Sequence, residues 1–332
     1  MPWTGVPLAH GTDDLGPPTV GTLLAPRVGS WLTLALVVAA GLYLYGVWVL
    51  HRRGDRWPVG RTLLFLGPGL GGIAAVTLTG FAGYDDLLLS VHMVQHMVLS
   101  MVAPIFLALG APVTLALRTL PRGPRRVLLA VVHSRVARVL AFPLVAYALF
   151  VATPFALYFT GLYRLTLEND FVHELTHLHF VVVGCLFFWP LLSVDPLPGR
   201  WPYPGRALLM FLSTPFHTVL GLTIMQSATL IGGDWYPSLH LPWSDPVADQ
   251  RMAGGILWAS GEFVSVTMLA VLVVQWMREA EREARRVDRQ LDREEAEAAA
   301  ATGRAEPGEG AGTTGLSGTI PSARQPRGAT GR

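Results

Sequence analysis

Two stretches of the sequence place histidines one helical turn apart. "LLLSVHMVQHMVLSM" holds His92 and His96, and "FVHELTHLHF" holds His173 and His177 at the same spacing of four residues. Residues at i and i+4 lie on the same face of a helix. Each stretch therefore presents a pair of imidazoles on one face, and imidazole is a common ligand of zinc, copper and iron.

The second stretch also matches the H-E-x-x-H signature of zinc metalloproteases. In that chemistry His173 and His177 bind Zn²⁺, and Glu174 acts as the general base. A third protein ligand is required, and the sequence offers no clear motif for it. This interpretation also leaves His92 and His96 without a role.

Methionines beside the first histidine pair favour copper instead. Met93 and Met97 follow His92 and His96 in "HMVQHM". Thioether sulfur selects Cu(I), and imidazole suits copper in general. Without an evident nucleophile we expect copper transfer and no enzymatic activity. A di-iron oxygenase would need an H-x2-H-H cluster, and two axial haem ligands would not need paired histidines at one depth.

The elements that position these side chains are predicted to be membrane-spanning helices. The chain has 332 residues, of which 51% are hydrophobic and 14% charged, whereas soluble domains carry about 25% charged residues. Its single cysteine, Cys185, excludes an internal disulfide and a C-x-x-C motif. A span needs about 20 apolar residues. We predict an all-α bundle of seven transmembrane helices at residues 29–50, 62–81, 87–109, 136–159, 171–194, 206–231 and 252–277.

The distribution of arginine predicts the orientation of the bundle. The loops after the first, third and fifth spans are rich in arginine, and the alternate loops are acidic or mixed. Cytoplasmic loops carry the excess of positive charge. The N-terminus is therefore predicted outside and the C-terminus in the cytoplasm. Both histidine pairs then lie at one depth near the outer surface, between spans three and five.

The same patterns divide the chain into four parts. Residues 1–28 are predicted to be an extracytoplasmic segment, and residues 29–277 form the transmembrane domain. Residues 278–301 are charged and helix-prone, which predicts a cytoplasmic helix. Residues 302–332 are rich in Gly, Ala, Thr and Pro, a composition typical of disorder.

Further polar groups fall inside or beside the spans. His217 and Glu262 lie within spans six and seven, where ionisable residues are functional candidates by default. His179 is about 200° around the helix from His177, so it is expected to point elsewhere. Asp249 and Gln250 lie at the predicted outer mouth of span seven.

Four motifs in this order make the sequence resemble a known family. "SVHMVQHMVLSMVAPIFLALGAPVTLALR", "HELTHLHFVVVGCLFFWPLLSVDPLP", "TPFHTVLGL" and "DQRMAGGILWASGE" are similar to the CtaG-type cytochrome c oxidase assembly factors of bacteria. The resemblance implies a seven-helix plasma-membrane protein needed for maturation of haem–copper oxidase, with a proposed role in copper delivery. The positions that match the family pattern are His92, His96, His173, His177, His179, His217, Asp249, Gln250 and Glu262.

Our hypothesis is an assembly factor that binds copper, as Cu(I), at an outward-facing site between spans three and five. Its expected partners are the copper-containing subunit of the oxidase, the lipid bilayer and an extracytoplasmic copper donor, and no nucleic acid. The alternatives are an intramembrane zinc metalloprotease and an assembly scaffold without metal. The expected ligands are His92, His96, His173, His177, Met93 and Met97, supported by His179, His217, Glu262, Asp249 and Gln250.

Overall fold

The computed structural model describes residues 16–27, 31–196 and 201–304 of the chain. Within these residues the regular structure is helical, and the only β-type pairing is an isolated antiparallel bridge between Pro26 and Thr79. Six helices are long and apolar enough to cross a membrane, and a bent pair provides a seventh candidate. The protein is therefore an all-α multi-pass membrane protein, as predicted. Its orientation in the membrane stays a prediction.

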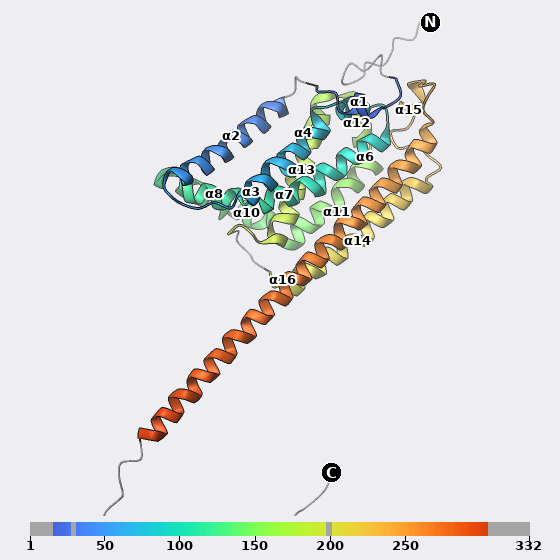
Figure 1. Ribbon diagram of the computed structural model, residues 1–332. Helices are drawn as coiled ribbons and strands as arrows, with labels where there is room; N and C mark the ends of the chain where they lie inside the picture. The colour runs from blue at the N-terminus through green and yellow to red at the C-terminus, as the bar shows by residue number, and fades with distance from the viewer. Residues whose placement is uncertain (1–15, 28–30, 197–200, 305–332) are drawn as a thin grey trace, which may run out of the picture. The chain divides into compact units, whose positions relative to one another are not determined.

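In the first half of the chain α2 is a continuous span, whereas the second and third spans are built from interrupted helices (Figure 1). Two interruptions are π-helical segments, η1 and η2, and Pro68 lies inside η1. Proline has no backbone N–H to donate, which favours such a shift in the hydrogen-bond pattern. In chain order the elements are α1 (Val20–Leu23), α2 (Trp31–Arg52), α3 (Val59–Leu64), η1 (Phe65–Gly71), α4 (Gly72–Thr77), α5 (Phe81–Tyr84), α6 (Leu89–Met97), η2 (Val98–Val102), α7 (Ala103–Leu109) and α8 (Pro112–Thr119).

The second half holds the longer helices. The charged segment predicted at residues 278–301 lies within the last of them, and the two compact units of the chain meet between Met277 and Arg278. In chain order the elements are α9 (Arg122–Val132), α10 (Arg135–Leu140), α11 (Pro143–Phe159), α12 (Leu162–Glu168), α13 (Asp170–Leu192), α14 (Tyr203–Gln226), α15 (Trp235–Ser238) and α16 (Pro246–Arg304). Residues 302–304 of the predicted tail belong to α16. The rest of that tail and most of the N-terminal segment predicted at residues 1–28 lie outside the described residues.

The fourth predicted span differs most from the structure. Residues 136–159 do not form one helix, because α10 ends at Leu140 and α11 begins at Pro143. Proline suits the first position of a helix, where its missing N–H leaves no bond unmade. A second break follows Phe159, and α12 leaves α11 at an angle of 70°. The span is thus the bent pair α11–α12.

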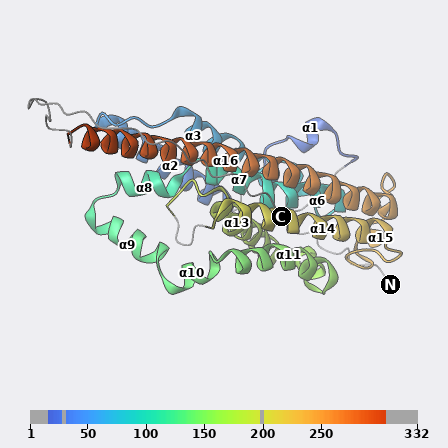
Figure 2. The ribbon, with the colours of Figure 1, turned by 90° about the horizontal axis from the view of Figure 1, so that it is seen from below.

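The helix α13 lies at the centre of the bundle. It packs against η2 and α7 and also against α11 and α12. Gly184 allows this closeness, because a Cβ atom there would lie 2.2 Å from the backbone oxygen of Ser100. The two histidine-bearing helices predicted from the sequence, α6 and α13, are thereby held in one core, and α14 runs beside the first part of α16 in both views (Figures 1 and 2).

The outward faces of the spans are apolar. Leu34 and Val37 on α2, Phe211 on α14 and Phe263 on α16 are each more than half exposed. A soluble protein would bury such residues, whereas lipid tails are as apolar as these side chains. The exposed faces therefore fit a surface that is covered by lipid.

Candidate metal centre

The start of α13 positions two imidazoles inside the bundle. The side chain of Asn169 accepts a hydrogen bond from the backbone N–H of Val172 (3.1 Å), which caps the helix. His173 and His177 follow on one face, and only 0% and 5% of their surfaces are exposed. Their ring centroids are 4.5 Å apart. The predicted pairing of these two side chains on one buried face is therefore present.

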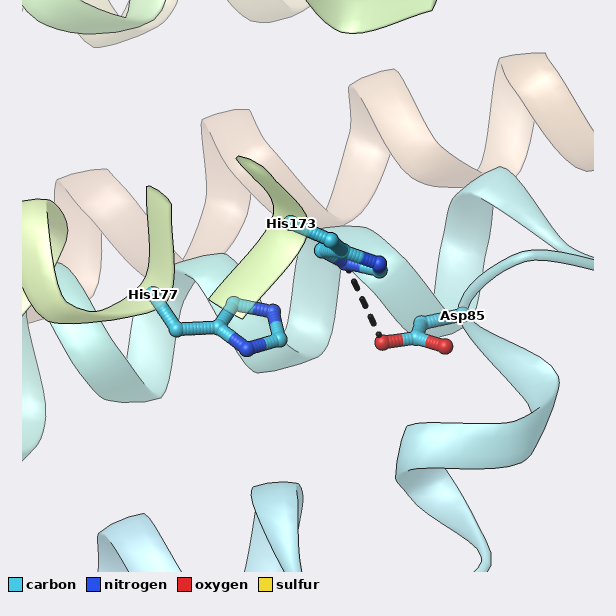
Figure 3. A group of neighbouring side chains, drawn as sticks. All are labelled: Asp85, His173 and His177. Atoms are coloured by element: carbon cyan, nitrogen blue, oxygen red, sulfur yellow. Dashed lines mark ion pairs between the residues drawn. The ribbon is translucent and has the colours of Figure 1, made fainter. Parts of the chain in front are cut away.

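Two carboxylates meet His173 from a different element. Asp85 and Asp86 follow α5, and both are fully buried. The Nε2 atom of His173 lies 3.5 Å from Oδ2 of Asp85, and its Nδ1 atom lies 3.3 Å from Oδ1 of Asp86. Figure 3 shows the Asp85 carboxyl group turned toward the His173 ring, with His177 beside it. The indole N–H of Trp235 donates to the backbone oxygen of Asp86 (2.9 Å) and holds this turn in place.

Asp85, His173 and His177 together form a possible metal-binding group. One ligand atom from each lies within 4.8 Å of the others, and all three residues are buried. Two imidazoles and one carboxylate are a donor set that proteins use for zinc, copper and iron. Asp85 was not among the metal ligands predicted from the sequence. The pair of adjacent acids just before the first histidine helix was its only signal.

Gln95 fixes the tautomer of His177. Its Nε2 amide donates to the backbone oxygen of Val76 (2.9 Å), so its Oε1 atom faces Nε2 of His177 at 3.1 Å. Because an amide oxygen only accepts, His177 carries its proton on Nε2. The lone pair of the neutral ring then resides on Nδ1, in the form that a metal ligand requires.

His92 is the third buried imidazole of this region. It is 2% exposed, and its ring centroid lies 5.9 Å from that of His173 and 5.0 Å from that of Tyr163. Within the described part of the chain, neither ring nitrogen of His92 has a hydrogen-bond partner. Leaving a buried polar atom without a partner costs about 1–3 kcal/mol. A cation at this edge of the group would give one of these nitrogens a partner, so the residues present fit a metal ion.

The second imidazole of α6 lies in a different environment. Nδ1 of His96 lies 3.1 Å from the hydroxyl of Tyr158, and its ring lies 4.1 Å from that of Phe180. The same tyrosine hydroxyl donates to the sulfur of Met93 at 3.7 Å. Met97 is buried in the apolar core. The predicted ligands His96 and Met93 thus meet at Tyr158, and of the two only His96 lies one helical turn beyond His92.

Asp249 and Gln250, at the start of α16, contact neighbouring segments. Asp249 accepts hydrogen bonds from the backbone N–H (3.2 Å) and the hydroxyl of Ser90, in the first turn of the helix that carries His92. Gln250 accepts from the backbone N–H of Ile231 (2.7 Å) and donates to the backbone oxygen of Ile224 (3.3 Å). The two residues thereby anchor α6 and the end of α14.

The remaining predicted supporting residues lie along α13, α14 and α16. His179 is exposed, and its Nε2 atom lies 3.1 Å from the hydroxyl of Thr153. His217 is buried, with Nδ1 lying 3.3 Å from the carbonyl oxygen one turn before it. Glu262 is half-buried and accepts a hydrogen bond from Thr218 at 3.4 Å. As expected, His179 does not join His173 and His177 and instead contacts α11.

A pocket of about 230 Å³ is lined by residues that include His240, Asp249 and Tyr236. The Tyr236 hydroxyl is 2.5 Å from that of Tyr163, whose ring contacts His92. Burial raises the pKa of the Tyr236 phenol well above its usual value, and the nearby carboxylate charges, led by that of Asp249, raise it further. Tyr236 therefore lines the pocket as a neutral phenol and is hydrogen-bonded to the tyrosine whose ring contacts His92.

Comparison with known proteins places the chain in a family. Residues 41–279 match the family model described as cytochrome c oxidase caa3 assembly factor (Caa3_CtaG). Uncharacterized proteins of Mycobacterium bovis and Mycobacterium tuberculosis are each 41% identical over 285 residues, which are 83% of this chain and 43% of theirs. One of Mycobacterium leprae is 36% identical over 266 residues, 78% of this chain and 40% of its own. The chain thus spans less than half the length of these relatives. No solved structure matches it.

Proposed function

The chain belongs to the cytochrome c oxidase caa3 assembly factor family, and we propose that it serves oxidase assembly by carrying copper. The metal is bound in the bundle core and passed to the copper-containing subunit of the oxidase in the bacterial plasma membrane. The observation that carries this proposal is the buried group of Asp85, His173 and His177, whose ligand atoms lie within 4.8 Å of one another.

The environment of this group supports transfer more than catalysis. His92 brings further nitrogen donors to its edge. Met93, directly after His92, and Met97, one turn further along α6, bring soft sulfur, and thioether sulfur favours Cu(I). A carrier must release its cargo, and a mixed set of imidazole, carboxylate and sulfur allows ligands to exchange one at a time. We infer that the protein acts without a chemical reaction on its cargo.

The pocket beside Tyr236 is our candidate for the route by which copper arrives. It is lined by His240, Asp249 and Tyr236, and the hydroxyl of Tyr236 is hydrogen-bonded to Tyr163, whose ring contacts His92. Replacing Ser244, which lines the pocket, by tryptophan should slow copper loading severalfold and leave the affinity unchanged. Stopped-flow loading measured beside an equilibrium titration tests this, and equal loading rates would exclude the route.

Metal titration of single variants tests the proposal. The purified protein is loaded with Cu(I) without oxygen and titrated against a competing chelator. We expect His177→Ala to lose the copper and His179→Ala, the matched change two residues further along α13, to retain it. Loss of copper in His96→Ala would support the larger ligand set predicted from the sequence, whereas retention would support the group around Asp85. Equal copper in wild type and His177→Ala would overturn the proposal and favour a scaffold without metal.

Oxidase assembly in cells provides the second readout. Cells that lack the protein are complemented with wild type, His177→Ala or His179→Ala, and oxidase activity is measured in their membranes. We expect only His177→Ala to fail at low copper supply, and added copper to restore part of the activity. Full activity of His177→Ala at low copper would argue against delivery even if the purified protein binds the metal.

One observation favours a second candidate function, an intramembrane zinc protease. Asp85 supplies the third ligand that the H-E-x-x-H motif lacks in the sequence, and a set of two histidines and one carboxylate is typical of catalytic zinc. Glu174 would be the general base. Under this alternative Glu174→Gln abolishes oxidase assembly and leaves metal binding intact, whereas a copper carrier tolerates that change.

A further inference from the structure

An arginine-rich arm connects α8 to α11. It comprises residues 122–138, which include α9 and the first turn of α10, and we call it the basic arm. No aspartate or glutamate occurs between Asp86 and Glu168. In the described structure no carboxylate pairs with Arg122, Arg125 or Arg126. The arm is therefore an uncompensated patch of positive charge.

The basic arm also exposes apolar side chains. The helix α9 has no buried residue, and Val127 and Val131 are 64% and 60% exposed. Figure 2 shows α8, α9 and α10 as an arc at the edge of the first unit. An isolated helix of 11 residues is marginally stable in water. A helix with basic and apolar residues of this kind is typical of the membrane interface.

An apolar groove of about 510 Å³ separates the basic arm from α13. The polar groups on its walls are already engaged. The hydroxyl of Ser134 accepts from the backbone N–H of Ala137, and the indole of Trp189 donates to Asp195. A polar occupant would find few partners here, whereas a hydrocarbon chain needs none. The residues that form the walls include Val132, Val136, Leu140, Val182, Leu186 and Trp189.

We propose that this groove binds an acyl chain of an anionic phospholipid, with the phosphate held by the arginines of the basic arm. The apolar groove accounts for the chain and the arginines account for the charge. Basic pockets on the cytoplasmic side of membrane proteins bind anionic headgroups, and the arginines of this loop predict that side. The proposal is independent of the metal centre.

Native mass spectrometry of the full-length protein tests the proposal. The protein in detergent is offered phosphatidylglycerol and phosphatidylcholine with identical acyl chains. We expect one phosphatidylglycerol to be retained preferentially. The triple variant Arg122→Gln, Arg125→Gln, Arg126→Gln should lose this preference by on the order of 100-fold, since each basic residue near an anionic surface contributes about a factor of five. Equal retention of the two lipids by wild type would overturn the proposal.

Further variants test the position of the charge and the role of the groove. Arg282→Gln, Arg285→Gln, Arg286→Gln removes the same charge from the helix after Met277 and should leave the preference unchanged. Val182→Trp fills the groove and should reduce retention of both lipids, whereas Val219→Trp, on an exposed face of α14, should not. Bound phosphatidylglycerol is also challenged with inorganic phosphate and, separately, with fresh phosphatidylglycerol. If the two competitors displace it equally well, the site is a simple anion site and the acyl-chain assignment is wrong.

Discussion

Buried carboxylates lie at both ends of α13, and the groups that contact them differ between the two ends. Asp195, just after the helix, is 1% exposed and accepts hydrogen bonds from the backbone N–H of Thr114 (2.7 Å) and the indole of Trp189 (2.9 Å). Asp85 and Asp86, at the other end, are equally buried but face the imidazole of His173.

The two ends differ in whether a metal ion could replace the group that contacts the carboxylate. The donors to Asp195 are N–H and O–H groups at the start of α8 together with the indole N–H of Trp189. No cation can displace them without breaking the fold. An imidazole that faces a carboxylate can give up its proton, and a metal ion can then bind both groups. Burial alone therefore does not mark a functional carboxylate. The chemistry of its partners does.

The largest expected effect is on metal affinity at the histidine end. Asp85→Asn removes the anionic ligand and should weaken metal binding by about 100-fold or more, since even changes to residues behind the ligands cost 10–100-fold. Competition with a chelator measures this. Asp195→Asn is the matched change at the other end and should bind metal as wild type does. A similar loss of affinity in both variants would show that burial, and not the partner, decides.

The next effect is on stability at the opposite end. Asp195→Ala leaves the donors of Thr114 and Trp189 without an acceptor and should lower the free energy of unfolding by about 3 kcal/mol. Thermal unfolding in detergent measures it, with Thr114→Ser as a control that keeps its hydroxyl. An unchanged melting temperature would mean that water replaces the carboxylate.

A smaller effect is expected at Gln95. Gln95→Leu removes the acceptor that keeps the proton of His177 on Nε2 and should weaken metal binding by about tenfold, the lower end of the range for residues behind a ligand. The same chelator competition applies. If Gln95→Leu and wild type bind equally, the tautomer is set by another group.

The smallest effect concerns pH. The guanidinium of Arg164 donates a hydrogen bond to Asp234 and lowers the pKa of that carboxyl. A lowered pKa in the folded state gives stability above the unfolded pKa, about 3.9 for aspartate, that is lost as pH falls through the folded pKa. Asp234→Asn should abolish this small acid-dependent part. The free energy of unfolding of both proteins is measured between pH 3 and 7. The same loss of stability with falling pH in wild type and Asp234→Asn would contradict a lowered pKa at Asp234.

Local patterns explain which parts of the fold and site were predictable. The spacing of His173 and His177 places both rings on one face, because helix geometry depends only on nearby residues. The spans were predictable because apolar length is a local property. Asp85 was not, because its approach to His173 depends on how the turn after α5 packs against α13. The bend after Phe159 likewise arises from a short break that leaves the apolar pattern almost continuous.

The shortness of α11 has a consequence for the surrounding bilayer. Within the bent pair α11–α12, the 17 residues of α11 give a length of about 25 Å, which is less than the roughly 30 Å of the hydrocarbon layer, and α12, turned by 70°, adds little along the same axis. A bilayer accommodates a short helix by becoming thinner around it. Headgroups and water should therefore approach the bundle more closely along this helix than along α13.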